Sequence, residues 1–145
     1  MKNRYKCHGI YFKRINHPKY KYELLKDYKI KVDVKIHINT DFLTVDNKGN
    51  MTIKKGYRWD GCSGPSWDGF VFGVLVNKTN MRAGLVHDAL YQLMRMERIP
   101  LSYRKYADDL FHKILLQDDM TRWRAWCYWK AVRVSCEKYA KPEKA

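Results

Sequence analysis

The hydrophobic pattern of this chain changes its period once, and that change constrains the fold more than any other feature. Over residues 1–55 apolar and polar side chains tend to alternate, which is typical of half-buried β-strands. Over 79–139 apolar side chains recur every three or four residues, which is typical of amphipathic helices. We therefore expect an α+β fold with an N-terminal antiparallel sheet or hairpins and three C-terminal helices. A glycine-rich, aromatic loop at 56–78 would join them within a single domain, 1–145, which ends in a frayed tail at 140–145.

The β region contains two clear local signals. From Tyr28 to Ile38 the alternation is nearly strict, so a strand with a basic outer face is predicted there. Segments 42–45 and 51–54 flank a turn sequence, Asp46 to Gly49, in which glycine can adopt a positive φ, so a hairpin is predicted. Residues 10–25 are expected to add one or two strands around a turn at 17–18.

The helical region is divided by capping signals. The first helix is expected from a cap at Thr79 or Asn80 to about Arg98, before Pro100. Ser102 is expected to cap the second helix, and Thr121 the third, which would run to about residue 139. The second helix has a predicted core stripe of Tyr103, Ala107, Leu110, Phe111 and Ile114. In the loop, the apolar run 70–76 is interpreted as a buried strand, with an exposed flap or an interface as the alternatives.

The composition limits the function classes. The chain has 29 Lys and Arg against 15 Asp and Glu, a formal net charge of +14, which suits an acidic partner: nucleic acid, an anionic lipid surface or an acidic protein. A merely basic, soluble protein is the alternative. No apolar run is long enough to cross a bilayer, and the N-terminal residues lack the apolar stretch of a signal peptide. We expect a protein retained in a cytoplasm or packed into a particle from there.

The cysteines do not form a metal or redox motif. No two of them are spaced C-x-x-C, which excludes classical zinc-ribbon and thioredoxin interpretations, and reduced thiols are expected. Cys127 is predicted to be a small buried hydrophobe beside two tryptophans. The four cysteines are Cys7, Cys62, Cys127 and Cys136.

Four acidic and imidazole side chains are candidates for catalysis: Asp60, His87, Asp88 and Asp108. If the first two helices pack antiparallel, His87, Asp108 and the loop residue Asp60 converge, and such groups suit a divalent metal or acid–base chemistry. The alternative is a structural network that ties a helix to the glycine-rich loop. In either case we expect His87 and Asp60 to be mostly buried at that junction. Comparison with His-Asp phosphohydrolases fails, because no earlier helix supplies a further histidine.

The third helix has two apolar faces. Trp123, Cys127, Ala131 and Val134 share one face, and the candidate binding residues Arg122, Trp126, Trp129 and Arg133 lie along another. A helix of this kind is either sandwiched or uses one face for a partner, where Trp and Arg suit stacking on bases, sugars or protein aromatics. The alternative is that the tryptophans are core and the arginines extend to solvent.

Three motifs occur in a specific order: W-D-G-x-S-G-P at 59–65, H-D-x-L-Y at 87–91 and R-x-x-A-D at 104–108. With the Trp-rich stretch 122–133, they make residues 20–135 resemble a phage and prophage family known as domain of unknown function 1353. The resemblance implies a phage or prophage origin and no defined reaction. The apolar run at 70–76 departs from it as an apparent insertion. The motif positions are Asp60, Ser63, Pro65, His87, Asp88, Tyr91 and Asp108.

Two functions of different classes follow. The leading expectation is a basic phage or prophage accessory protein, or a virion-associated one, that acts by macromolecular binding in the host cytoplasm or virion. It would inhibit a host defence complex or form part of a tail or capsid. The alternative is a metal-dependent hydrolase of cell wall or nucleic acid, with a divalent metal at the acidic candidates. A phage or host protein is the expected partner, nucleic acid is a second candidate, and a homo-oligomer is a third.

Overall fold

The computed structural model describes residues 4–60 and 78–142. The chain divides into two compact units, Met1–Gly61 and Cys62–Ala145. The first contains the strands and the second the helices, so the expected α+β class is confirmed. The expectation of a single domain stays a prediction. The apolar run 70–76 and the motif positions Ser63 and Pro65 lie outside the described residues.

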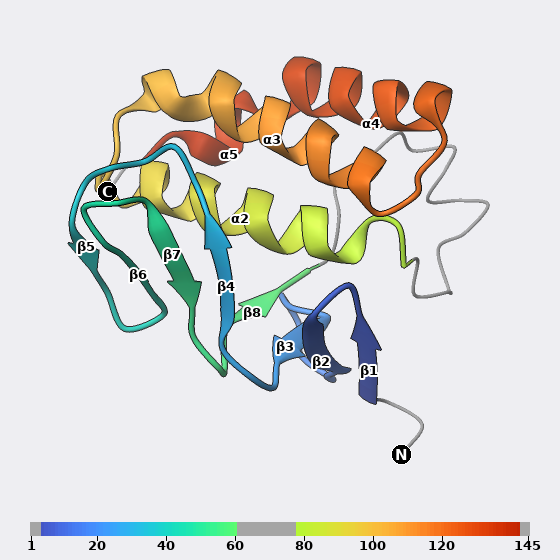
Figure 1. Cartoon of the computed structure of the whole chain (residues 1–145), viewed down its shortest axis with the longest axis horizontal. Helices are drawn as coiled ribbons and strands as arrows, with labels where there is room; N and C mark the ends of the chain where they lie inside the picture. The colour runs from blue at the N-terminus through green and yellow to red at the C-terminus, as the bar shows by residue number, and fades with distance from the viewer. Residues whose placement is uncertain (1–3, 61–77, 143–145) are drawn as a thin grey trace. The chain divides into compact units, whose positions relative to one another are not determined.

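The first sheet is formed by the two ends of the β unit. Its strand order is β1-β2-β3-β8, and every neighbouring pair is antiparallel (Figure 1). The strands are β1 (Arg4–Cys7), β2 (Ile10–Arg14), β3 (Tyr22–Leu24) and β8 (Arg58–Trp59). The two strands expected within 10–25 are β2 and β3. The turn between them is fixed by His17, whose Nδ1 accepts backbone N–H bonds from Lys19 at 3.1 Å and Tyr20 at 3.2 Å.

An aromatic cluster explains why a strand forms at the start of the expected loop. Phe12 and Trp59 are buried, and their ring centroids lie 5.8 Å apart. Tyr22 completes the group at 5.6 Å from Trp59. Rings packed at these separations stabilise beyond the area they bury. They hold β8 against β3, although its sequence is part of the glycine-rich segment.

The second sheet has the strand order β4-β7-β6-β5. Its strands are β4 (Tyr28–Lys31), β5 (Ile38–Asn39), β6 (Leu43–Val45) and β7 (Asn50–Ile53), again antiparallel. β6 and β7 form the predicted hairpin. Gly49 has the expected positive φ, +87°, and Asp46 closes the turn by accepting backbone N–H bonds from Lys48 and Asn50.

The prediction of one strand from Tyr28 to Ile38 is wrong. β4 ends at Lys31, and one further bond follows, from the N–H of Val32 to the carbonyl of Gly49 at 2.8 Å. Because β7 begins at Asn50, the ladder between these strands ends at this point. The alternation of burial nevertheless continues as far as Val34, which is buried, whereas Ile36 is exposed.

The helical unit contains α2 (Met81–Arg95), a 3₁₀ turn η1 (Leu101–Tyr103), α3 (Arg104–Gln117), α4 (Arg122–Ser135) and α5 (Glu137–Ala140). α3 packs on α2 and on α4, and α5 packs on α2 and α4 (Figure 1). In the described ranges no helix combines the length and the apolar character needed to cross a membrane.

Three helix boundaries differ from those expected. α2 ends before Arg98, because Glu97 adopts a φ of +58° and Arg98 donates its N–H to the carbonyl of Leu93, a Schellman motif. Ser102 lies inside the 3₁₀ turn, so it is not an N-cap. The third helix breaks at Cys136 and continues as α5.

The helical core agrees only in part with the predicted stripes. Ala107, Phe111 and Ile114 of α3 are buried as expected, whereas Tyr103 and Leu110 are half-buried. α2 buries residues around most of its circumference, because it packs on two other helices. Its buried residues are Met81, Ala83, Gly84, Leu85, Val86, His87, Ala89, Leu90, Tyr91, Leu93 and Met94.

Candidate functional site

Two motif residues of α2, His87 and Tyr91, meet at one buried carboxylate, that of Asp108 on α3. Asp108 Oδ1 lies 2.7 Å from His87 Nε2 and accepts a hydrogen bond of 2.6 Å from the Tyr91 hydroxyl. Its Oδ2 accepts a bond of 2.8 Å from Arg133 Nη1 on α4. His87 and Tyr91 reach the same oxygen because residues four apart share one face of a helix. One side chain thus connects three helices.

Arg104, one turn before Asp108 on α3, lies beside the carboxylate. Its Nη2 lies 3.9 Å from Asp108 Oδ2, and its Nε donates to the Tyr91 hydroxyl at 3.2 Å. The same guanidinium donates to the carbonyls of Val132 at 3.0 Å and Arg133 at 2.7 Å. Cations are favourable at a helix C-terminus, where carbonyls lack intrahelical partners. We call His87, Tyr91, Arg104, Asp108 and Arg133 the Asp108 network.

The centre of the network lies out of contact with water, whereas its arginines are partly exposed. The Asp108 side chain is 0% exposed and that of His87 is 3% exposed. The His87 ring also packs against the rings of Tyr91 and Phe111, with centroids 4.2 and 4.7 Å away. A buried carboxylate needs full hydrogen bonding and a compensating charge, and the two arginines and the buried donors supply both.

Burial and bonding move the pKa values of the network in different directions. Burial alone would raise the pKa of Asp108, but the bonds from His87, Tyr91 and Arg133 outweigh it and hold that pKa below its usual range. Burial lowers the pKa of His87 and the bond to Asp108 offsets this only in part, so the imidazole is neutral at pH 7. Burial, then the bond to Asp108, raises the pKa of Tyr91. Asp108 is thus the anion of the network, and Tyr91 stays protonated.

This arrangement is chemically that of a satisfied ionic network. Both oxygens of Asp108 already accept strong bonds, two of them from groups that also pack in the core. A metal ion at Asp108 would have to displace at least one of these donors. Within 4–60 and 78–142 no three His, Cys, Asp or Glu side chains are placed to hold a metal together.

The two other acidic candidates are less buried than Asp108. Asp88 is half-buried on α2 and makes interactions of its own. Asp60 is exposed and follows β8 in the other unit. The prediction that Asp60 is mostly buried is therefore wrong, whereas the same prediction for His87 is confirmed. The rest of the glycine-rich loop, which follows Asp60 directly, lies outside the described residues.

A family described as "Protein of unknown function (DUF1353)" matches residues 24–132, well over half of the chain. The chain belongs to this family. No curated protein and no solved structure matches the chain.

The DUF1353 match covers four members of the Asp108 network and ends one residue before Arg133. It also contains the H-D-x-L-Y and R-x-x-A-D motifs. The first and last residues of R-x-x-A-D are Arg104 and Asp108, which lie on one face of α3 and both contact Tyr91. The chemistry that these two motifs encode is therefore one shared ionic network. The role of Arg104 was missed from sequence, although its i, i+4 spacing to Asp108 was the available signal.

The candidate binding residues on α4 separate into two groups. Trp129 Nε1 donates to Asp109 at 2.9 Å, and Arg133 donates to Asp108, so both are half-buried and bonded to α3. Arg122 and Trp126 are exposed. All four are expected from the sequence to share one face of the helix. In the structure Trp129 and Arg133 of this face contact α3, whereas its other two residues are exposed.

α4 buries one narrow side and leaves several large apolar side chains exposed on another. Ala125, Tyr128 and Val132 are buried, whereas Trp123 is 68%, Trp126 50% and Val134 71% exposed. The interpretation of these two tryptophans as core is therefore wrong, and Cys127 is only half-buried. The five exposed residues on one side of the helix are Arg122, Trp123, Trp126, Lys130 and Val134, which we call the α4 outer face.

Proposed function

We propose that this chain is a phage- or prophage-encoded accessory or virion-associated protein that binds a macromolecule through the α4 outer face. The observation that carries the proposal is the exposure of Trp126, 50%, on a helix whose opposite side is fixed in the core. Large apolar side chains seldom gather on the surface of a monomer unless the surface serves binding. Tryptophan and arginine are also the residues that most often dominate binding energy at interfaces.

The Asp108 network supports this assignment by holding the surface in place. Arg133 and Trp129 attach α4 to α3 through bonds to Asp108 and Asp109. Arg104 fixes the last turn of α4 through its carbonyls. A helix held at these points presents its outer side chains in one arrangement, which lowers the entropy lost on binding. The motif residues thus contribute to binding by positioning α4, although they do not lie on its outer face.

The charge of the chain favours an acidic partner. The formal net charge is +14, and Arg122 and Lys130 lie on the α4 outer face beside the exposed apolar groups. A complementary surface would be an apolar cleft with acidic residues at its rim, on a phage or host protein. Two versions of the function fit this partner: an inhibitor of a host defence complex, and a component of a tail or capsid.

The experiment compares wild type with Trp126→Ala and with Tyr139→Ala, a matched control whose ring is 53% exposed on α5. Tagged proteins are purified from phage-infected cells, co-purifying proteins are quantified, and the partner is then tested in purified form. We expect a partner that Trp126→Ala loses and Tyr139→Ala retains. Equal recovery with all three proteins would overturn the proposal.

Two further measurements separate the versions. Detecting the chain in purified virions by mass spectrometry would assign it to the particle, and its absence there would favour the accessory role. Metal analysis addresses the hydrolase alternative directly. A stoichiometric divalent ion that is lost in a folded His87→Gln variant would replace the binding proposal with the metal-dependent one.

A further inference from the structure

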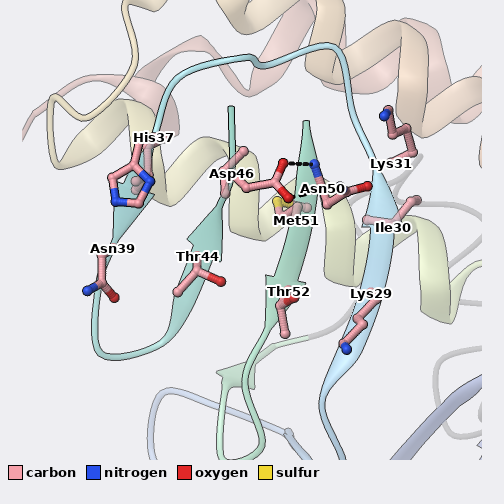
Figure 2. A pocket seen from close by; sticks show the side chains of 12 residues that line it. Lys29, Ile30, Lys31, His37, Asn39, Thr44, Asp46, Asn50, Met51 and Thr52 are labelled. Atoms are coloured by element: carbon pink, nitrogen blue, oxygen red, sulfur yellow. Dashed lines mark hydrogen bonds between the residues drawn. The ribbon is translucent and has the colours of Figure 1, made fainter. Parts of the chain in front are cut away.

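A pocket lies on the face of the second sheet that carries its polar side chains. It belongs to the first unit, whereas the α4 outer face belongs to the second. The volume of the pocket is about 680 Å³, within the range of ligand sites, and its lining comes from all four strands (Figure 2). The register aligns a row of polar side chains across the sheet: Lys29 opposite Thr52, Thr52 opposite Thr44, and Thr44 opposite Asn39. Alternate residues of each strand point to the opposite face, where Met51 is buried.

Two lysines give the pocket its positive side. Lys29 and Lys31 are both exposed and lie two residues apart on β4, so they share a face at a spacing of about 6.6 Å along the strand. His37 and Asn39 lie at the opposite side of the pocket (Figure 2). A ligand that crosses the sheet therefore meets two lysines at one side and an imidazole and an amide at the other.

The single carboxylate in the lining is committed to the hairpin turn. Asp46 Oδ1 accepts the backbone N–H bonds of Lys48 and Asn50, and its Oδ2 accepts a bond of 2.8 Å from Asn50 Nδ2. The bonds from Asn50, backbone first, lower the pKa of Asp46, so it stays ionised. Because Asn50 Nδ2 faces Asp46, the amide oxygen of Asn50 points away from it, toward β4 (Figure 2).

Besides the Asp46 carboxylate, which is bonded within the turn, the lining combines cations with hydroxyl and amide groups. Lysine ammonium groups pair with phosphate oxygens, and the Asn50 amide oxygen accepts bonds from ligand hydroxyls. The hydroxyls of Thr44 and Thr52 donate and accept. A ligand that matches this set carries phosphates and free sugar hydroxyls on one chain, which is the chemistry of an RNA backbone.

We propose that this pocket binds a segment of single-stranded RNA, with Lys29 and Lys31 on phosphates and Asn50 and Thr52 on ribose 2′-hydroxyls. The pocket volume suits part of one strand. None of the pocket-lining residues, all within 4–60, is Phe, Tyr or Trp, so the His37 ring is the one aromatic group of the lining on which a base could stack. Recognition is of the backbone and independent of base sequence, because stacking accepts any base. The inference does not depend on the α4 outer face, which binds a protein.

The first test measures fluorescence anisotropy with labelled oligo(rU) and oligo(dU) of equal length at several low salt concentrations. We expect rU to bind more tightly than dU, and oligo(rA) to bind about as well as rU. Replacing both pocket lysines, Lys29→Ala with Lys31→Ala, should weaken binding about tenfold or more and reduce the slope of log K against log salt by about 1.4, since each phosphate contact on a single strand contributes about 0.7.

The matched control is Lys21→Ala with Lys55→Ala, which removes the same charge from exposed residues of the same unit outside the pocket. An equal loss in both double variants would show that only net charge binds RNA and would overturn the assignment of the pocket. Absence of binding at low salt, with circular dichroism showing folded protein, would overturn it as well.

The second test addresses the ribose contact with Thr52→Val, a substitution of similar shape that removes only the hydroxyl. We expect it to reduce the preference for rU over dU while the salt dependence stays unchanged, because the lysines remain. Equal affinity of the wild-type protein for rU and dU would overturn the RNA assignment. Trp126→Ala should leave RNA binding unchanged, which separates this inference from the proposed function.

Discussion

His87 Nε2 and Asp108 Oδ1 lie 2.7 Å apart, although 21 residues of chain separate them. The pair joins α2 to α3 at a point where both side chains are almost fully buried. Three further donors or cations, from Tyr91, Arg104 and Arg133, extend the pair to α4. One negative charge thus ties three helices of this unit together, and its contribution can be tested by removing it.

Asp108→Asn is expected to lower the free energy of unfolding by about 3 kcal/mol or more, since removing one partner of a buried ion pair leaves the other charges without compensation. The amide keeps the size of the side chain but directs N–H groups at donors such as Arg133. Urea denaturation at neutral pH measures the change. Asp109→Asn is the control: its carboxylate is 43% exposed, and its ion pair with Lys105 should contribute less than about 1 kcal/mol.

The lowered pKa of His87 makes stability depend on pH in a defined direction. Burial disfavours the imidazolium, so the folded chain binds its proton only below the ordinary value of 6.5, whereas the unfolded chain binds it near that value. Below pH 6.5 the unfolded state therefore holds more protons. The free energy of unfolding falls as the pH falls, by at most about 1.4 kcal/mol per pH unit from this group.

His87→Gln isolates this contribution. At about pH 7.5 the variant is less stable than wild type because the bond to Asp108 changes, and the difference should shrink toward about pH 5.5 as wild type loses the contribution of its histidine. Urea denaturation of both proteins across this range measures the difference. A constant gap would show that folding leaves the pKa of His87 unchanged, and a gap that widens with falling pH would show that folding raises it.

Local sequence signals predicted the parts of the fold that depend on local chemistry. The hairpin at Asp46 to Gly49 was found because a turn residue and a glycine with positive φ lie between two alternating segments. The change from period two to period 3.6 predicted the α+β class, and the motifs around His87 and Asp108 predicted the family. Each of these signals is contained in a short stretch of chain.

The parts that failed depend on contacts between distant residues. The end of β4 is set by the position where its partner β7 begins, next to Gly49. The alternation after Tyr28 contains no information about where the partner strand begins. The buried side of α4 is set by its contact with α3. Because the helix has two apolar faces, its sequence pattern alone could not decide which of them is buried. The bond from Arg133 to Asp108 spans 25 residues, so its place in the network could not be read from local spacing.

Three glycines have a positive φ within residues 4–60 and 78–142: Gly9, Gly49 and Gly56. Of these, Gly49 should be the least tolerant of substitution. A Cβ at Gly49 would lie 2.2 Å from the carbonyl oxygen of Val32, whereas at Gly56 it would meet nothing within 4 Å. Both alanine variants bear the backbone strain, of about 1–2 kcal/mol, and only Gly49→Ala adds the clash. Thermal unfolding compares them. Equal losses would show that the backbone at Val32 moves aside without cost.

Arg104→Lys tests whether geometry, rather than charge, holds the end of α4. The guanidinium donates to the carbonyls of Val132 and Arg133 and to the Tyr91 hydroxyl at the same time, which a single ammonium at the end of a flexible stem cannot reproduce. We expect a loss of about 1–2 kcal/mol in the free energy of unfolding, since these are bonds to a charged group. Hydrogen exchange should accelerate in the last turn of α4 and less in its first, because local opening then begins at the released carbonyls. Lys105→Arg, on the exposed side of the same turn of α3, is the control and should leave both measurements unchanged. If Arg104→Lys retained the stability and the exchange pattern of wild type, positive charge alone would be sufficient at this position.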